Sequence, residues 1–260
     1  MSENVIYCYS GSGNCLDMAK KIAAELGDTD IVLMRSYPAI TDATGYKCLG
    51  FVFPCYGGGL PGDVEKFIKD IRFDESAYRF AVVQYAGYKG CGLYKLNAKV
   101  GLHYWSGISN HCSAIWLMPH DLTFPRTTLP EAQQRSDKAA LEVAAAVRAR
   151  QKSAGKPPKN ALCALESAGF SKINRFINSR MTVNDDCTAC GRCAAICPRG
   201  NIRISAGKAV IGRDCFGCMA CVEYCPQEAI NVGRITVKRE RFHNANVTAE
   251  ELTEKVIHLD

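Results

Sequence analysis

Apolar and amphipathic stretches alternate along the first 150 residues. Short runs rich in Val, Ile and aromatic residues predict strands at 3–9, 29–34, 48–53, 80–85 and 112–118. Between them, apolar residues recur at helical spacing and predict helices near 14–26, 62–71, 89–100 and 130–150. Strands that are apolar along their whole length and alternate with helices indicate a parallel sheet covered on both faces. We therefore expect a doubly wound α/β domain over residues 1–150.

The pattern changes after residue 150. The stretch K-S-A-G-K-P-P at 152–158 predicts a domain boundary, and residues 151–181 are expected to form a linker with a helical segment. Residues 182–232 are dense in cysteine and predict a second, small domain. Residues 233–260 are expected to form a tail with one weak helix at about 248–257 and no chemistry of its own.

Composition limits the class of protein and the compartment in which it is expected to work. The chain has 260 residues, 15 cysteines and a formal charge of +6. No apolar run approaches the roughly 18 residues of a membrane span, and the start lacks the basic segment of a signal peptide. An odd number of cysteines without a secretory signal favours metal or redox chemistry over disulfides. Because the basic residues are dispersed, nucleic-acid binding is disfavoured. We expect a cytoplasmic protein, and the sequence does not determine its oligomeric state.

Eight cysteines lie in an internal repeat. The copies are C-T-A-C-G-R-C-A-A-I-C-P at 187–198 and C-F-G-C-M-A-C-V-E-Y-C-P at 215–226. Both have the spacing C-x2-C-x2-C-x3-C-P, in which the fourth cysteine ligates the other cluster of a two-cluster ferredoxin. Zinc is the alternative, but zinc sites usually show paired C-x2-C elements separated by a longer loop. The compact double run favours iron–sulfur clusters.

This block resembles the bacterial two-cluster ferredoxins. The resemblance implies that one [4Fe–4S] cluster is held by Cys187, Cys190, Cys193 and Cys225. It implies that the other [4Fe–4S] cluster is held by Cys215, Cys218, Cys221 and Cys197.

A glycine-rich loop, S-G-S-G-N-C at 10–15, follows the first predicted strand and opens a helix. Backbone N–H groups at a helix start, beside serine hydroxyls, form an anion cradle. The loop lacks the Walker Gly-Lys-Ser/Thr and the third glycine of the dinucleotide fingerprint. It resembles the flavodoxin phosphate loop, S/T-x-T/S-G-N-T, with a thiol in place of the last hydroxyl. The resemblance implies that the FMN phosphate is held by Ser10, Gly11, Ser12, Gly13, Asn14 and Cys15.

Two further loops, at 54–61 and 86–91, follow predicted strand ends, where doubly wound sheets bind ligands. The flavodoxin resemblance implies that they border the flavin ring, with Tyr56 or Tyr88 stacking on it. The loop residues expected at the flavin are Pro54, Cys55, Tyr56, Gly57, Gly58, Gly87, Tyr88 and Gly90. The alternative is that both loops are plain strand-to-helix turns with exposed tyrosines.

Other candidates are weaker. His120 lies in a third edge loop at 118–122, and a lone surface histidine is more often neither a flavin contact nor a docking contact. The thiols of Cys15, Cys55 and Cys91 lie in the expected flavin loops, but no cysteine–histidine pairing supports catalytic thiol chemistry. Cys163 is expected to pack as a small apolar residue.

The whole chain resembles the fused flavodoxin–ferredoxin proteins of anaerobes, of the EFR1 type. This implies a flavodoxin-like, doubly wound, five-stranded parallel sheet of order 2-1-3-4-5 and a small C-terminal α+β two-cluster ferredoxin domain. It also implies FMN and two [4Fe–4S] clusters as cofactors. Because a flavin and cubane clusters together carry electrons, we expect an electron carrier that serves a partner oxidoreductase. The alternative is an FMN-dependent reductase of a small substrate, fed by the clusters, with the segment 101–130 as a lid.

Overall fold

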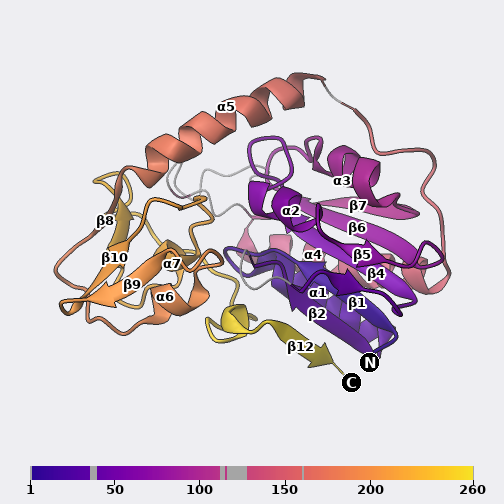
Figure 1. Cartoon of the computed structure of the whole chain (residues 1–260), viewed down its shortest axis with the longest axis horizontal. Helices are drawn as coiled ribbons and strands as arrows, with labels where there is room; N and C mark the ends of the chain where they lie inside the picture. Colours follow the sequence, from indigo (N-terminus) through magenta and orange to yellow (C-terminus); the bar gives the residue numbers. More distant parts are fainter. Residues whose placement is uncertain (1, 36–39, 112–114, 116–127, 160, 260) are drawn as a thin grey trace.

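The computed structural model describes residues 2–35, 40–111, 115, 128–159 and 161–259. A larger α/β sheet domain lies beside a smaller, cysteine-rich domain (Figure 1). One long helix, α5 (Ala161–Asn178), runs along one side of both. Among the described residues, no helix is both long and apolar enough to cross a membrane.

A six-stranded sheet of order β12-β2-β1-β4-β6-β7 organises the larger domain. Five of its strands pair in parallel. They are β1 (Asn4–Cys8), β2 (Thr29–Leu33), β4 (Cys48–Pro54), β6 (Tyr78–Tyr85) and β7 (Tyr104–Ser109). Numbered among themselves, these five follow the order 2-1-3-4-5, so the predicted doubly wound sheet is confirmed. The short strands β3 (Asp42–Ala43) and β5 (Arg72–Phe73) pair separately.

Helices bury both faces of the sheet. The helices α1 (Asn14–Leu26) and α4 (Leu129–Arg148) contribute to one apolar core. The helices α2 (Gly62–Phe67) and α3 (Gly92–Val100) contribute to the other. Successive residues of β1 belong to opposite cores, as strand geometry requires. The apolar strands of the sequence are therefore apolar because each meets helices on both sides.

The fifth parallel strand differs from the prediction. An apolar run at 112–118 was expected to form it, but the strand is β7, at 104–109. Of the range 112–118, only Ile115 lies within the described residues, in a turn. At the edge of the sheet, five of the six β7 residues are only half-buried. A half-buried edge strand tolerates the mixed sequence Y-W-S-G-I-S, so choosing the most apolar run selected the wrong segment.

The chain returns to the sheet after the cysteine-rich domain. The helix predicted at 248–257 is wrong, because this stretch forms the 3-10 helix η2 (Glu251–Thr253) and the strand β12 (Val256–Leu259). The strand β12 pairs antiparallel with β2, with Ile257 opposite Ile31. The cysteine-rich domain is thus an insertion between two strands of one sheet.

The smaller domain repeats one local structure, as its repeated sequence predicts. The pairs β8 (Met181–Val183) with β11 (Ile230–Val232) and β9 (Ile202–Ser205) with β10 (Lys208–Ile211) are antiparallel. The short helices α6 (Arg192–Ile196) and α7 (Ala220–Glu223) each contain the third cysteine of a copy. Each helix follows a residue in the left-handed region, Gly191 in the first copy and Met219 in the second.

We predict that Gly50→Ala destabilises the sheet domain. A Cβ at Gly50 would lie 2.4 Å from Cζ of the fully buried Phe80. Overpacking of this kind typically costs about 1–3 kcal/mol of unfolding free energy. Urea denaturation followed by circular dichroism measures it, with Gly169→Ala on α5 as the control, since a Cβ there meets nothing within 4 Å. Unchanged stability of Gly50→Ala would contradict the close packing of β4 on β6.

Candidate functional site

The structure gathers the eight repeat cysteines around two cavities. The first is lined by Cys187, Cys190, Cys193 and Cys225, among others. The second is lined by Cys197, Cys215, Cys218 and Cys221, among others. Each cavity combines three cysteines of one copy with the fourth of the other copy. In the described ranges, no group of three or more His, Cys, Asp or Glu side chains is arranged to hold a single metal ion.

Backbone N–H groups point at the fourth sulfur of each copy. The Asn201 N–H donates to Cys197 Sγ and the Ala229 N–H donates to Cys225 Sγ, each at 3.3 Å. The donor lies four residues after the cysteine in both copies. N–H donors to sulfur stabilise thiolates and tune the potential of any cluster that they hold.

The two cavities differ in burial. Cys190 in the first cavity is exposed, whereas Cys221 in the second is buried. Burial raises the pKa of Cys218 to about 12 and the pKa of Cys193 to about 11. These thiols therefore keep their protons at neutral pH unless a cation stabilises the thiolates, as iron does.

The second cavity lies against the carboxyl edge of the sheet. A Cβ at Gly11 would come within 2.2 Å of the Cys218 carbonyl oxygen, so no other residue fits there without a shift. The ring of Phe216 stacks on Tyr56, with centroids 6.2 Å apart and an interplanar angle of 29°. Two of the three expected flavin loops, 10–15 and 54–61, thus contact the 215–221 loop.

A buried ion pair holds this arrangement. Arg199 Nε donates to Asp63 Oδ1 at 2.7 Å, and the Asp63 side chain is only 1% exposed. The Tyr9 hydroxyl donates to the same carboxylate at 3.0 Å. On the other side, Arg35 Nη2 donates to the Cys197 carbonyl at 3.0 Å. Because an unpaired buried carboxylate is costly, the pair ties the second cavity to α2.

The 10–15 loop presents unsatisfied donors. Gly13 precedes α1 with φ of 93°, and its N–H donates to Ser10 Oγ at 3.1 Å. The N–H groups of Ser12, Asn14 and Cys15 donate to no described residue. Unsatisfied N–H groups at a helix start are the donors that a phosphate accepts, so these residues fit an anion.

The 54–61 and 86–91 loops meet one another. The Cys91 N–H donates to the Gly58 carbonyl at 2.8 Å. The Tyr56 ring lies among Tyr9, Phe170 and Phe216, whereas Tyr88 is 45% exposed. Of the two tyrosines that were expected to stack on the flavin, Tyr88 is the more accessible.

Several predictions stay untested by the geometry. The loop at 118–122 with His120, and most of the expected lid at 101–130 beyond residue 111, lie outside the described residues.

Cys15 is buried and its thiol lies 3.5 Å from Gln84 Oε1. Cys163, expected to pack as a small apolar residue, is buried on α5.

Sequence reasoning missed the residues that join the domains. Asp63 and Arg199 are 136 positions apart, and neither belongs to a recognisable motif. The helix-start position of Asp63 beside the 54–61 loop was the only local signal, and it does not identify a partner.

Residues 186–230, which include all eight repeat cysteines, match the 4Fe-4S dicluster domain family. No curated protein matches the chain. Among solved structures, the chain is similar to an FMN-dependent NADH-azoreductase from Bacillus anthracis str. Ames Ancestor in complex with FMN. That similarity has 9% identity and a TM-score of 0.40, over 56% of this chain and 99% of that chain. It is also similar to two-electron reduced Megasphaera elsdenii flavodoxin, with 16% identity and a TM-score of 0.34, over 53% and 98% of the two chains. The chain therefore combines a doubly wound sheet domain with a region similar to the dicluster iron–sulfur domains.

Proposed function

We propose that this protein carries electrons between two [4Fe–4S] clusters, an FMN at the sheet edge and a partner oxidoreductase. The contact between the second cysteine copy and the expected flavin loops carries this proposal. The Cys218 carbonyl lies against Gly11, and the Phe216 ring lies on Tyr56. One-electron exchange requires cofactors near one another, and this contact brings the two binding regions together within one chain.

We assign the cysteines to the two clusters as the two cavities group them, so that each cluster takes three ligands from one copy and the fourth from the other. The first cluster is held by Cys187, Cys190, Cys193 and Cys225. The second cluster is held by Cys197, Cys215, Cys218 and Cys221. The match to the dicluster family and the two four-cysteine cavities support this assignment. Because Cys190 is exposed, the first cluster faces the partner protein and the second faces the flavin.

The flavin assignment rests on the chain's own donors. The N–H groups of the 10–15 loop bind the phosphate, and the loops at 54–58 and 87–90 border the ring, with Tyr88 as the accessible tyrosine. When bound, FMN supplies a centre that exchanges either one or two electrons. The chain is then a fused flavodoxin–ferredoxin protein of the EFR1 type, and its abundance of free thiols suits the cytoplasm.

Anaerobic purification tests the cofactors. We expect roughly eight iron and eight sulfide per chain, the content of two four-iron clusters, together with one FMN. Metal analysis, sulfide assay and chromatography of the released flavin measure these contents. Zinc in place of iron, or FAD in place of FMN, would overturn the corresponding part of the proposal.

Cysteine variants test the crossed ligation. Cys197→Ala should remove a ligand from the second cluster, so its reduced paramagnetic spectrum should match that of Cys221→Ala. The matched control is Cys193→Ala, which lies in the same copy as Cys197 but lines the other cavity. A Cys197→Ala spectrum that instead matches Cys193→Ala would show that each copy ligates its own cluster.

Rapid mixing with dithionite tests electron transfer within one chain. Flavin absorbance should change after cluster absorbance, with a rate constant independent of protein concentration. Cys197→Ala, which lacks a ligand of the cluster beside the flavin, should slow the flavin phase. A rate that rises in proportion to protein concentration would indicate transfer between molecules.

A further inference from the structure

We propose that the segment Asn244–Val247, which follows the iron–sulfur domain, is part of the flavin phosphate site, with Asn244 as its positioning residue. The inference rests on the proposed function, since it concerns the same 10–15 loop. In this view Asn244 holds the loop in the conformation that binds phosphate, although it lies 230 residues away from Asn14 in the chain.

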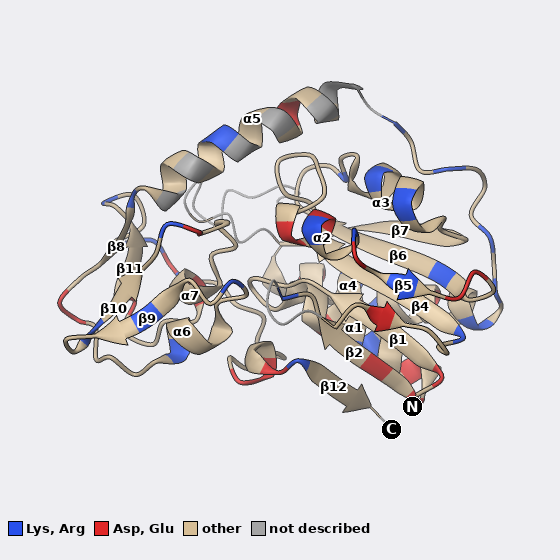
Figure 2. Ribbon diagram, viewed as in Figure 1, with Lys and Arg blue, Asp and Glu red and all other residues tan. Residues whose placement is uncertain are grey.

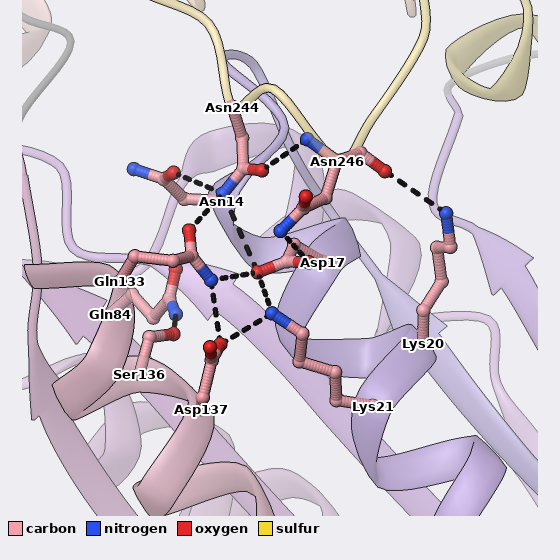
Figure 3. Close-up of polar contacts among 10 residues, drawn as sticks. All are labelled: Asn14, Asp17, Lys20, Lys21, Gln84, Gln133, Ser136, Asp137, Asn244 and Asn246. Carbon is pink, nitrogen blue, oxygen red and sulfur yellow. Dashed lines mark hydrogen bonds and ion pairs between the residues drawn. The ribbon is translucent and has the colours of Figure 1, made fainter. Parts of the chain in front are cut away.

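Asn244 makes two hydrogen bonds to the 10–15 loop, the expected phosphate loop. Its backbone N–H donates to the Ser12 carbonyl at 2.8 Å. Its Nδ2 donates to Asn14 Oδ1 at 3.0 Å (Figure 3). Asn14 Nδ2 in turn donates to the His111 carbonyl at 3.1 Å. Both ends of the Asn14 amide are therefore held, and the start of α1 has little freedom to turn.

The Asn244 amide is itself fixed in orientation. Its Nδ2 also donates to Gln133 Oε1 at 3.1 Å, and its Oδ1 accepts from the Asn246 N–H at 2.9 Å. Asn244 is only 3% exposed, so water does not replace these partners. A buried amide with donors and acceptor all satisfied adopts one orientation.

Asp17 anchors the segment on α1. This carboxylate is 2% exposed and accepts from Asn246 Nδ2 at 3.2 Å, from Gln133 Nε2 at 2.8 Å and from Lys21 Nζ at 2.8 Å (Figure 3). Lys20 Nζ donates to the Asn246 carbonyl at 3.1 Å. The segment is thus fastened to the first two turns of the helix whose N-terminus forms the cradle. Elsewhere, charged residues occur along the chain in both domains (Figure 2).

The segment also supports Gly13 from behind. A Cβ at Gly13 would lie 2.7 Å from the Tyr224 hydroxyl and 3.0 Å from Val247 Cβ. The Tyr224 hydroxyl donates to the Val247 carbonyl at 3.3 Å, and Tyr224 directly precedes Cys225. The left-handed conformation of Gly13 is therefore enclosed by the segment and by the second cysteine copy. A loop ordered before its ligand arrives binds that ligand more tightly, because less ordering remains to be done.

This arrangement predicts that the segment affects the binding of one flavin more than that of another. The segment contacts the phosphate loop, so its effect should depend on the phosphate of the ligand. Asn244→Ala should weaken FMN binding and leave the binding of riboflavin, which lacks the phosphate, nearly unchanged. A general loss of structure would weaken both flavins alike.

The experiment titrates flavin-stripped, iron-replete full-length protein with FMN and with riboflavin, following flavin fluorescence. We expect Asn244→Ala to raise the FMN dissociation constant about tenfold, the effect of losing buried hydrogen bonds, and to change that of riboflavin less than about twofold. Thr253→Ala is the matched control, because its hydroxyl donates to the Glu250 carbonyl in the same tail. The double variant Asn14→Ala/Asn244→Ala should bind FMN no more weakly than Asn14→Ala alone, since Asn244 acts through Asn14.

An unchanged FMN dissociation constant in Asn244→Ala, or an equal weakening of both flavins, would overturn the inference while leaving the proposed function intact. Additive effects in the double variant would show that Asn244 does not act through Asn14. A wild-type protein that binds neither flavin would overturn the proposed function together with the inference. Iron content, measured on every variant, shows whether the cysteine-rich domain has stayed folded.

Discussion

The close approach of the Cys218 carbonyl to Gly11 is the contact on which the arrangement of the two domains depends. It leaves no room for a side chain on the first glycine of the 10–15 loop. Around it, the buried pair of Arg199 with Asp63 and the Arg35 contact to Cys197 fix the same face electrostatically. Apolar stacking of Phe216 on Tyr56 completes the contact. The cysteine-rich domain is therefore docked by steric, ionic and aromatic contacts that converge on one edge of the sheet.

Local patterns in the sequence were sufficient for much of the fold. Four of the five parallel strands and the helices between them follow from apolar periodicity, because central strands and their covering helices bury apolar faces. The fifth strand was misplaced because β7 is an edge strand whose residues are half-buried. The strand β12 was missed because its four residues carry too short a pattern, and only pairing with β2 makes them a strand.

The candidate site divides in the same way. The cysteine repeats and the 10–15 loop could be predicted, because their spacing is local and tied to a specific chemistry. Contacts such as Arg199 with Asp63, or Asn244 with Asn14, join residues more than 100 positions apart. A single arginine or asparagine has many possible partners in a chain of this length. Only the folded structure selects among them.

The insertion of the iron–sulfur domain within the sheet has a mechanical consequence. A domain appended by one linker can swing and twist about that linker in all directions. Here the chain enters the domain after α5 and leaves it through the segment that runs to β12, so two covalent connections restrain it. Each connection limits how far the domain can move from the sheet, so two of them restrict its position and orientation more than one does, and the contact at Gly11 restricts them further. The distance between the sheet edge and the second cavity is thus limited by the covalent path of the chain as well as by its contacts.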